Sequence, residues 1–354
     1  MRLVLSLLLA AFLAPAASAY EPESGAWWNP AESGTGYYIE IQDNFLGFMA
    51  FSGDTNGRAK WFTSVGFLDY TNTGVSFQGD LVSYRNVQRA GGPYTGRPTA
   101  EPSFGTLRIV FDPDDNRRAT LTWPSGHTIP IQRHEFYFER PEDPAGVTAS
   151  TLKMLGEWQV TIDLSSNPDV DYPYSADVLV LDDYGWDSGV KAWAYEGCRP
   201  DDAQIGGCSN FALDNHDAAG YFASPTSEFP TGAQIIVVKD GYYNGVMWYA
   251  LYELAIGTND GSGLLTLYPC YNTPCTTNPY QYAAYPVRAF RSASRTFVQE
   301  GAGPAKRAGR GGGLAALLDA QGALPAGAKA VPPENAARAA RLAQIRMLEA
   351  RLGD

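Results

Sequence analysis

Short alternating segments separated by turn residues run through most of this 354-residue chain. Residues 37–42 alternate between apolar and polar side chains, Asp43-Asn44 can form a tight turn, and residues 45–51 continue as a partner strand. Further strands are expected at residues 59–65, 106–111, 119–123 and 128–133. Many short strands joined by Gly, Asn and Asp turns are typical of a barrel or a sandwich. We therefore predict an all-β fold built from antiparallel meanders.

An internal similarity divides the chain into two β modules. Gly25-Ala26-Trp27 matches Gly156-Glu157-Trp158, and each triplet opens a β segment. Three further matches follow in the same order: 56–61 over 188–193, 105–109 over 263–267, and 129–133 over 285–288. We predict two tandem antiparallel meander barrels or sandwiches that arose by divergent duplication, with insertions in the second copy. Chance similarity between two segments rich in Trp and Gly is the alternative.

Shifts in composition mark the expected boundaries. A Pro-rich, charged joint at residues 140–146 separates the modules. From residue 301 the chain becomes rich in Gly, Ala and Pro, which is typical of a flexible linker. The predicted organisation is a signal peptide at 1–19, a first β module at 20–140, a second at 151–300, a flexible linker at 301–333 and a C-terminal helix at 334–352.

The N-terminal segment and the cysteines both predict export. Arg2, the apolar residues 3–13 and the small residues 17–19 follow the pattern of a cleaved signal peptide. Four cysteines fall in the second module, and in an oxidising compartment we expect them to pair locally, Cys198 with Cys208 and Cys270 with Cys275. A zinc site is the alternative, but neither pair has Cys-x-x-Cys spacing. The expected location is the periplasm or the exterior.

The charge of the two modules excludes one class of partner. Residues 20–300 hold 17 Lys and Arg against 34 Asp and Glu. Nucleic-acid binding needs a basic surface, so we expect no nucleic-acid partner. No segment after the signal peptide is long and apolar enough for a transmembrane span, so none is expected.

The C-terminal helix carries one apolar stripe. Leu342, Ile345, Leu348 and Leu352 recur at helical spacing, with arginines around them. One interpretation packs this stripe on the protein's own body. The other uses it for homo-oligomerisation, or for docking on an acidic surface or membrane. The sequence leaves both open.

Two resemblances follow from the Trp motifs. The run from Trp27 to Gly36, Trp-Trp-Asn-Pro-Ala-Glu-Ser-Gly-Thr-Gly, resembles a β module of uncharacterised exported proteobacterial proteins. It covers the first module well and the second poorly, and it implies export but no activity. The Gly-x-Trp openings are also similar to those of lipocalin and avidin-like barrels, in which an arginine of the last strand packs over the tryptophan. That resemblance implies the pairs Trp27 with Arg133 and Trp158 with Arg288.

The first module also supplies the expected ligand site. Trp27 and Trp28 are neighbours in one expected strand, and neighbouring side chains of a strand point to opposite faces of the sheet. Only one of them can therefore face the core, and the other must point outward. With the nearby tyrosines it could form an aromatic platform for a sugar or an apolar ligand, although packing under a loop is the simpler role. The ligand-binding candidates are Trp28, Asn29, Glu32, Tyr37 and Tyr38.

No catalytic motif stands out. The three histidines lack zinc spacing, and no Gly-x-Ser-x-Gly elbow is present. We predict no catalytic, metal or cofactor residue and no cofactor, although acidic turns at 112–116 and 182–187 could bind calcium. The expected function is an exported, non-enzymatic protein that binds a glycan, a small apolar molecule or an envelope protein. The alternatives are a secreted glycan hydrolase using acidic residues, and an envelope assembly component that oligomerises through its tail helix.

Overall fold

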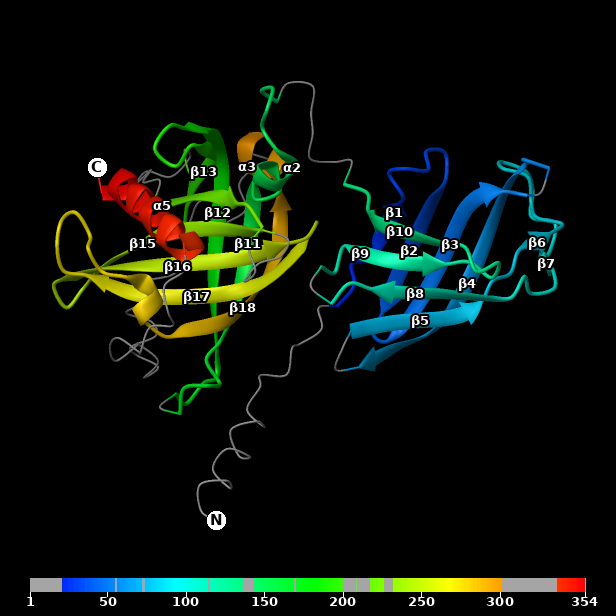
Figure 1. Cartoon of the computed structure of the whole chain (residues 1–354), viewed down its shortest axis with the longest axis horizontal. Coiled ribbons are helices and arrows are strands. Elements are labelled where there is room, and N and C mark those ends of the chain that lie inside the picture. The colour runs from blue at the N-terminus through cyan, green and yellow to red at the C-terminus, as the bar shows by residue number, and fades with distance from the viewer. Residues whose placement is uncertain are drawn as a thin grey trace, which may run out of the picture. The chain divides into compact units, whose positions relative to one another are not determined.

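The fold consists of two β-barrels and a C-terminal helix (Figure 1). The computed structural model describes residues 21–54, 56–71, 74–113, 115–135, 143–168, 170–199, 208, 217–225, 232–300 and 336–353. The expected signal peptide at 1–19 and linker at 301–333 lie outside these residues. The chain divides into two compact units, Met1–His134 and Glu135–Asp354, each with its own core.

The first unit is a closed antiparallel barrel of eight strands in which each strand pairs with its neighbours along the chain. The long connection from the fifth to the sixth barrel strand carries a separate two-stranded ribbon, β6 with β7. The strands are β1 (Gly25–Trp28), β2 (Gly36–Gln42), β3 (Phe45–Gly53), β4 (Ala59–Thr71), β5 (Gly74–Asp80), β6 (Tyr84–Arg85), β7 (Thr99–Ala100), β8 (Thr106–Phe111), β9 (Arg118–Thr122) and β10 (Thr128–Arg133).

The second unit is also a closed eight-stranded meander. Its strands are β11 (Gly156–Asp163), β12 (Tyr174–Asp187), β13 (Ala192–Cys198), β14 (Ala218–Ala223), β15 (Ala233–Tyr243), β16 (Val246–Ile256), β17 (Asp260–Cys270) and β18 (Ala284–Ser294). The helical segments are α2 (Ala149–Leu152), the 3-10 turn η3 (Pro279–Gln281), α3 (Arg295–Glu300) and α5 (Ala336–Gly353). The predicted all-β class with two tandem barrels is therefore confirmed, and the sandwich alternative is excluded.

Local sequence explains the hairpins. The turn between β2 and β3 places Asp43 at φ 58°, a left-handed conformation that Asp and Asn tolerate better than most residues. The turn between β15 and β16 uses Asn244-Gly245, both at positive φ, as a two-residue hairpin requires. Because neighbouring strand residues face opposite sides, alternate side chains then fill the barrels. Trp27 is 1% exposed inside the first barrel, whereas Trp28 is half-buried outside it.

Each barrel is closed by a tryptophan paired with an arginine. Trp27 lies opposite Arg133 in the pairing of β1 with β10, and Trp158 lies opposite Arg291 in the pairing of β11 with β18. Each indole Nε1 donates to a carbonyl four residues earlier, at 3.0 Å to Glu23 and 2.9 Å to Met154. The glycine two residues before each tryptophan, at φ 128° or 130°, leaves the space that the guanidinium occupies.

The pairing of Trp27 with Arg133 is as predicted, but that of Trp158 with Arg288 was wrong. Arg291 takes the expected place, with its guanidinium 4.3 Å from the centre of the Trp158 ring. The last strand of the second barrel is 11 residues long against six in the first, so the residue that reaches the tryptophan comes later in it. Arg288 pairs with Thr161 and points outward.

Two of the internal matches also need correction. Trp61 lies near the start of the fourth strand of its barrel, whereas Trp193 lies on the third strand of the other. Residues 105–109 likewise lie at the sixth strand and 263–267 on the seventh. Similar turns before both tryptophans explain the first mismatch, since Gly57 and Lys191 each adopt positive φ. Only the first and last matches fall on equivalent strands.

Both local disulfides are formed as predicted. Cys198 pairs with Cys208 beyond the end of β13, and Cys270 pairs with Cys275 beyond the end of β17. In the first barrel the corresponding connections are short, at residues 54–58 and 123–127. The disulfides therefore lie in the loops that lengthen the second module.

The tail helix packs on the outside of the second barrel, where it lies across the strands in Figure 1. Ile345 and Leu348 are fully buried and Leu352 is 7% exposed, against an apolar face that includes Tyr221, Ile235 and Leu251. Leu342 is half-buried. Of the two interpretations of the stripe, the structure shows packing on the protein's own body. Self-association through these residues would require the helix to leave the barrel.

Candidate binding sites

The five predicted ligand residues do not form one surface. Tyr37 is 3% exposed inside the first barrel, stacked 5.7 Å from Phe48, and burial raises the pKa of its hydroxyl. Asn29 is 4% exposed and holds the turn after β1, because its Oδ1 accepts from the Ala31 N–H at 3.1 Å. These two residues have structural positions that leave little of either side chain for a ligand.

The other three predicted residues are more accessible. Trp28 lies outside the barrel with its ring 4.8 Å from that of His134. Glu32 is in the turn, with Oε1 3.8 Å from Nε2 of His127. Tyr38 is 39% exposed on the outer face of β2. Trp28, Glu32 and Tyr38 therefore remain available for contact, but the structure does not gather them around a cavity.

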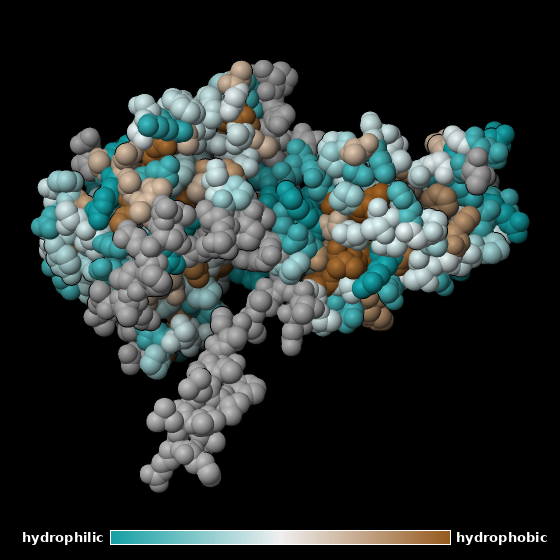
Figure 2. Space-filling view, in the orientation of Figure 1, coloured by the Kyte–Doolittle hydropathy of each residue, from teal (hydrophilic) through white to brown (hydrophobic). Residues whose placement is uncertain are grey.

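Tyr38 instead belongs to an aromatic face on the outside of β2, β3 and β4. Phe45 and Phe67 pair across β3 and β4 with ring centres 5.1 Å apart, and Trp61 stacks 5.6 Å from Tyr84. Both phenylalanines are more than 40% exposed. Figure 2 shows further hydrophobic residues on another side of this barrel, over β8. The face is an exposed aromatic patch rather than a pocket.

The interior of the second barrel holds a buried charged cluster. Arg199, directly after the disulfide-bonded Cys198, donates to Oδ2 of Asp177 at 3.0 Å and also pairs with Asp240. Tyr252 donates to the same Asp177 oxygen. Burial raises the pKa of Asp217 to about 7, although Arg199 beside it acts in the opposite direction. The two carboxylates that bind Arg199 are only 3% and 7% exposed, so this cluster is tied up in ion pairs within the fold.

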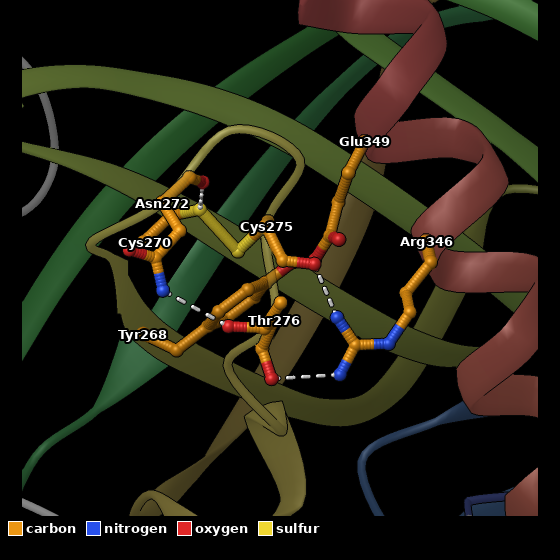
Figure 3. The surroundings of a disulfide bond; sticks show 7 residues. All are labelled: Tyr268, Cys270, Asn272, Cys275, Thr276, Arg346 and Glu349. Carbon is orange, nitrogen blue, oxygen red and sulfur yellow. Dashed lines mark hydrogen bonds between the residues drawn. A yellow bond between two sulfur atoms is a disulfide. The ribbon is translucent and has the colours of Figure 1, made fainter.

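A pocket of about 410 Å³ opens beside the C-terminal end of α5. Its walls come from β15, β16, the Cys270–Cys275 loop and the last turns of the helix. The disulfide loop is held against α5 by Arg346, which donates to the carbonyls of Cys275 and Thr276 (Figure 3). The residues that line the pocket include Lys239, Tyr242, Met247, Tyr249, Tyr271 and Glu349.

Glu349 is the electrostatic centre of this pocket. The residue is 3% exposed, and its Oε1 accepts a hydrogen bond of 2.6 Å from the Tyr268 hydroxyl. Its Oε2 is shielded from solvent and has no hydrogen-bond partner among the described residues. Burial raises the pKa of Glu349 to about 6, while the Tyr268 hydrogen bond and the charge of Arg346 lower it. An incompletely satisfied buried carboxyl is costly, and such groups are common at functional sites.

Sequence reasoning missed this pocket because its walls are far apart in the chain. Lys239 lies near the middle of the second unit and Glu349 near its C-terminal end. The one available signal was Glu349 itself, which directly follows Leu348 of the apolar stripe and therefore lies close to the buried side of the helix. Recognising it required knowing that the stripe packs on this barrel.

Comparison with protein-family models, curated proteins and solved structures gave no match. No helix among the described residues is both long and apolar enough to span a bilayer. Within the same residues, no group of three or more His, Cys, Asp or Glu side chains is arranged to hold a metal ion. At the turns considered for calcium, Asp115 pairs with Arg117 and Asp187 pairs with Arg351.

Proposed function

We propose that this chain is an exported, non-enzymatic binding protein that holds a small ligand in the pocket beside α5, which we call the α5 pocket. The observation that carries the proposal is a cavity of about 410 Å³ that is lined by both aromatic or apolar and polar side chains, one of which is a buried, half-satisfied carboxyl. Ligand sites are typically concave, mostly apolar and supplied with a few convergent polar groups. Export is supported by the N-terminal pattern and by the two disulfides.

The arrangement of acidic residues favours binding over hydrolysis. A glycosidase needs two carboxyl groups on opposite sides of a bound sugar, with space for the substrate between them. In the second barrel, Asp177 and Asp240 converge on Arg199 rather than on a cleft. In the α5 pocket, Glu349 is the only acidic residue among the lining residues.

The proposal is tested by ligand-observed NMR with a fragment library and the mature protein. Met247→Trp adds bulk to the wall of the α5 pocket and should reduce the signals of bound fragments. Met49→Trp is the matched control, because Met49 is a half-buried methionine on the outer face of the first barrel. Fragments that bind equally well to both variants and to the unmodified protein would place binding elsewhere and contradict the proposal.

A further inference from the structure

The α5 pocket contains a carboxylate oxygen that has no hydrogen-bond donor among the described residues. Tyr268 satisfies one oxygen of Glu349, and the other has no partner among the described residues. The carboxyl also forms no salt bridge within the described residues. A buried carboxylate oxygen without a hydrogen-bond partner destabilises the free protein. A ligand that donates a hydrogen bond to this oxygen removes that cost, which contributes to the free energy of binding. A charged donor gains most, since charge-assisted hydrogen bonds are about twice as strong as neutral ones.

The end of the helix favours the same sign of charge. Glu349 and Ala350 line the pocket from the last turns of α5, which ends at Gly353. The carbonyl groups at a helix C-terminus carry a partial negative charge that stabilises cations nearby. Lys239 already exploits this field, because its ammonium donates to the Leu352 carbonyl at 3.1 Å. Lys239 forms no salt bridge with Glu349 among the described residues, since its ammonium is held at the Leu352 carbonyl.

The remaining walls suit an apolar body. Tyr249 is 6% exposed and stacks on Tyr268, so it provides a fixed aromatic wall next to Glu349. Met247 adds a flexible apolar side chain that adapts to ligand shape. Tyr242 and Tyr271 are 78% and 69% exposed and could close over a ligand or face its positive charge.

We propose that the α5 pocket binds a small organic amine, whose protonated nitrogen donates to Glu349 and whose apolar body lies against Tyr249 and Met247. This inference rests on the function proposed above. In the free protein Oε2 is shielded, so binding includes a rotation of the carboxyl toward the cavity. The terminal torsion of Glu is broad, which makes that rotation inexpensive.

The inference predicts a specific dependence on pH. The groups that face Glu349 are Tyr268 from β17, Tyr249 from β16, Lys239 and Tyr242 from β15, and Arg346 from its own helix. Simple amines stay protonated throughout the range in which Glu349 titrates, with a pKa of about 6. Amine affinity should therefore be nearly constant above about pH 7 and fall roughly tenfold by about pH 5.

Isothermal titration calorimetry with matched probes tests this. We expect 2-phenylethylamine and hexylamine to bind the full-length mature protein more tightly than 2-phenylethanol and hexanol. Glu349→Gln should weaken amine binding by about tenfold or more at neutral pH and leave alcohol binding unchanged. Tyr268→Phe removes a donor that lowers the pKa of Glu349, so the midpoint of the pH profile should move upward. Tyr221→Phe, which removes a hydrogen bond from Tyr221 to Gln344 under the same helix, is the control.

The outcomes separate the two proposals. Amines that fail to bind at millimolar concentration, alcohols that bind as well as amines, or a Glu349→Gln variant with unchanged amine affinity would each overturn the amine assignment. Fragment binding that is blocked by Met247→Trp would still support the α5 pocket as a site. A pH midpoint that Tyr268→Phe does not move would also contradict the role given to Glu349.

Discussion

At the scale of single residues, the barrels depend on a few side chains that close them. Arg291 lies over Trp158 and donates to the carbonyls of Leu155, Lys153 and Thr258, so it combines a cation–π contact with three hydrogen bonds. Arg133 plays the matching part in the first barrel, where it donates to the Ala26 carbonyl and pairs with Glu23. The two barrels share this arrangement although little of their sequence matches.

Replacing Arg291 with Met should destabilise the second barrel by about 2–4 kcal/mol, because three carbonyl groups lose this donor and the indole loses its cation. Chemical denaturation followed by fluorescence measures the change. Arg288→Met is the matched control, since Arg288 is exposed on the same strand, and it should change stability by less than about 0.5 kcal/mol. Equal effects of both substitutions would show that barrel closure does not depend on Arg291.

At the scale of elements, the helix α5 is part of the second module rather than an appendage. Apolar contacts through Ile345 and Leu348 are accompanied by a buried ion pair of 2.6 Å between Arg341 and Glu253. Two of the helix arginines that suggested an acidic partner surface, Arg341 and Arg351, therefore have acidic partners within the same chain. Arg351 pairs with Asp187 and Glu196 in the same way.

The buried Glu349 should make the docked helix more stable in mild acid. Its pKa of about 6 in the folded protein lies above that of an exposed Glu. The stabilisation is fully present below the unfolded pKa and is lost as the pH rises through about 6. Glu349→Gln should therefore gain about 2 kcal/mol relative to the unmodified protein between about pH 4 and pH 7. Urea unfolding at both pH values measures this, with Tyr221→Phe as a variant whose pH dependence should match the unmodified protein.

The elements also show what the sequence could and could not predict. Strand and turn positions in the first barrel followed from alternation and from residues such as Asp43, because these signals are local. The partner of Trp158 did not follow, because it depends on the length of β18. The α5 pocket could not be predicted either, since β15, β16 and α5 meet only after the barrel has closed and the helix has docked.

At the scale of the whole molecule, covalent stabilisation is unevenly distributed. Both disulfides lie in the second unit, and the first unit contains no cysteine. Cys198–Cys208 also fixes the start of the loop in which Arg199 reaches the buried aspartates. We therefore expect oxidising conditions to stabilise the second barrel and not the first.

Reduction of the two disulfides should destabilise the second unit and leave the stability of the first unit unchanged. Opening a loop of about ten residues costs roughly 2–3 kcal/mol of stability. Hydrogen exchange measured by mass spectrometry, with and without dithiothreitol, should show faster exchange in peptides from β11 to β18. Peptides from β1 to β10 serve as the internal control and should be unchanged. Faster exchange in both sets would mean that the two barrels unfold as one cooperative unit.

The closure of both barrels limits the ways in which a partner protein can bind to their sheets. Proteins that recruit a partner by adding a strand need an unpaired sheet edge, and a closed barrel offers none. The two-residue strands β6 and β7 are too short to act as such a template. A partner that contacts the wall of either barrel must therefore do so through side chains, and the strands of both barrels are protected from edge-to-edge association.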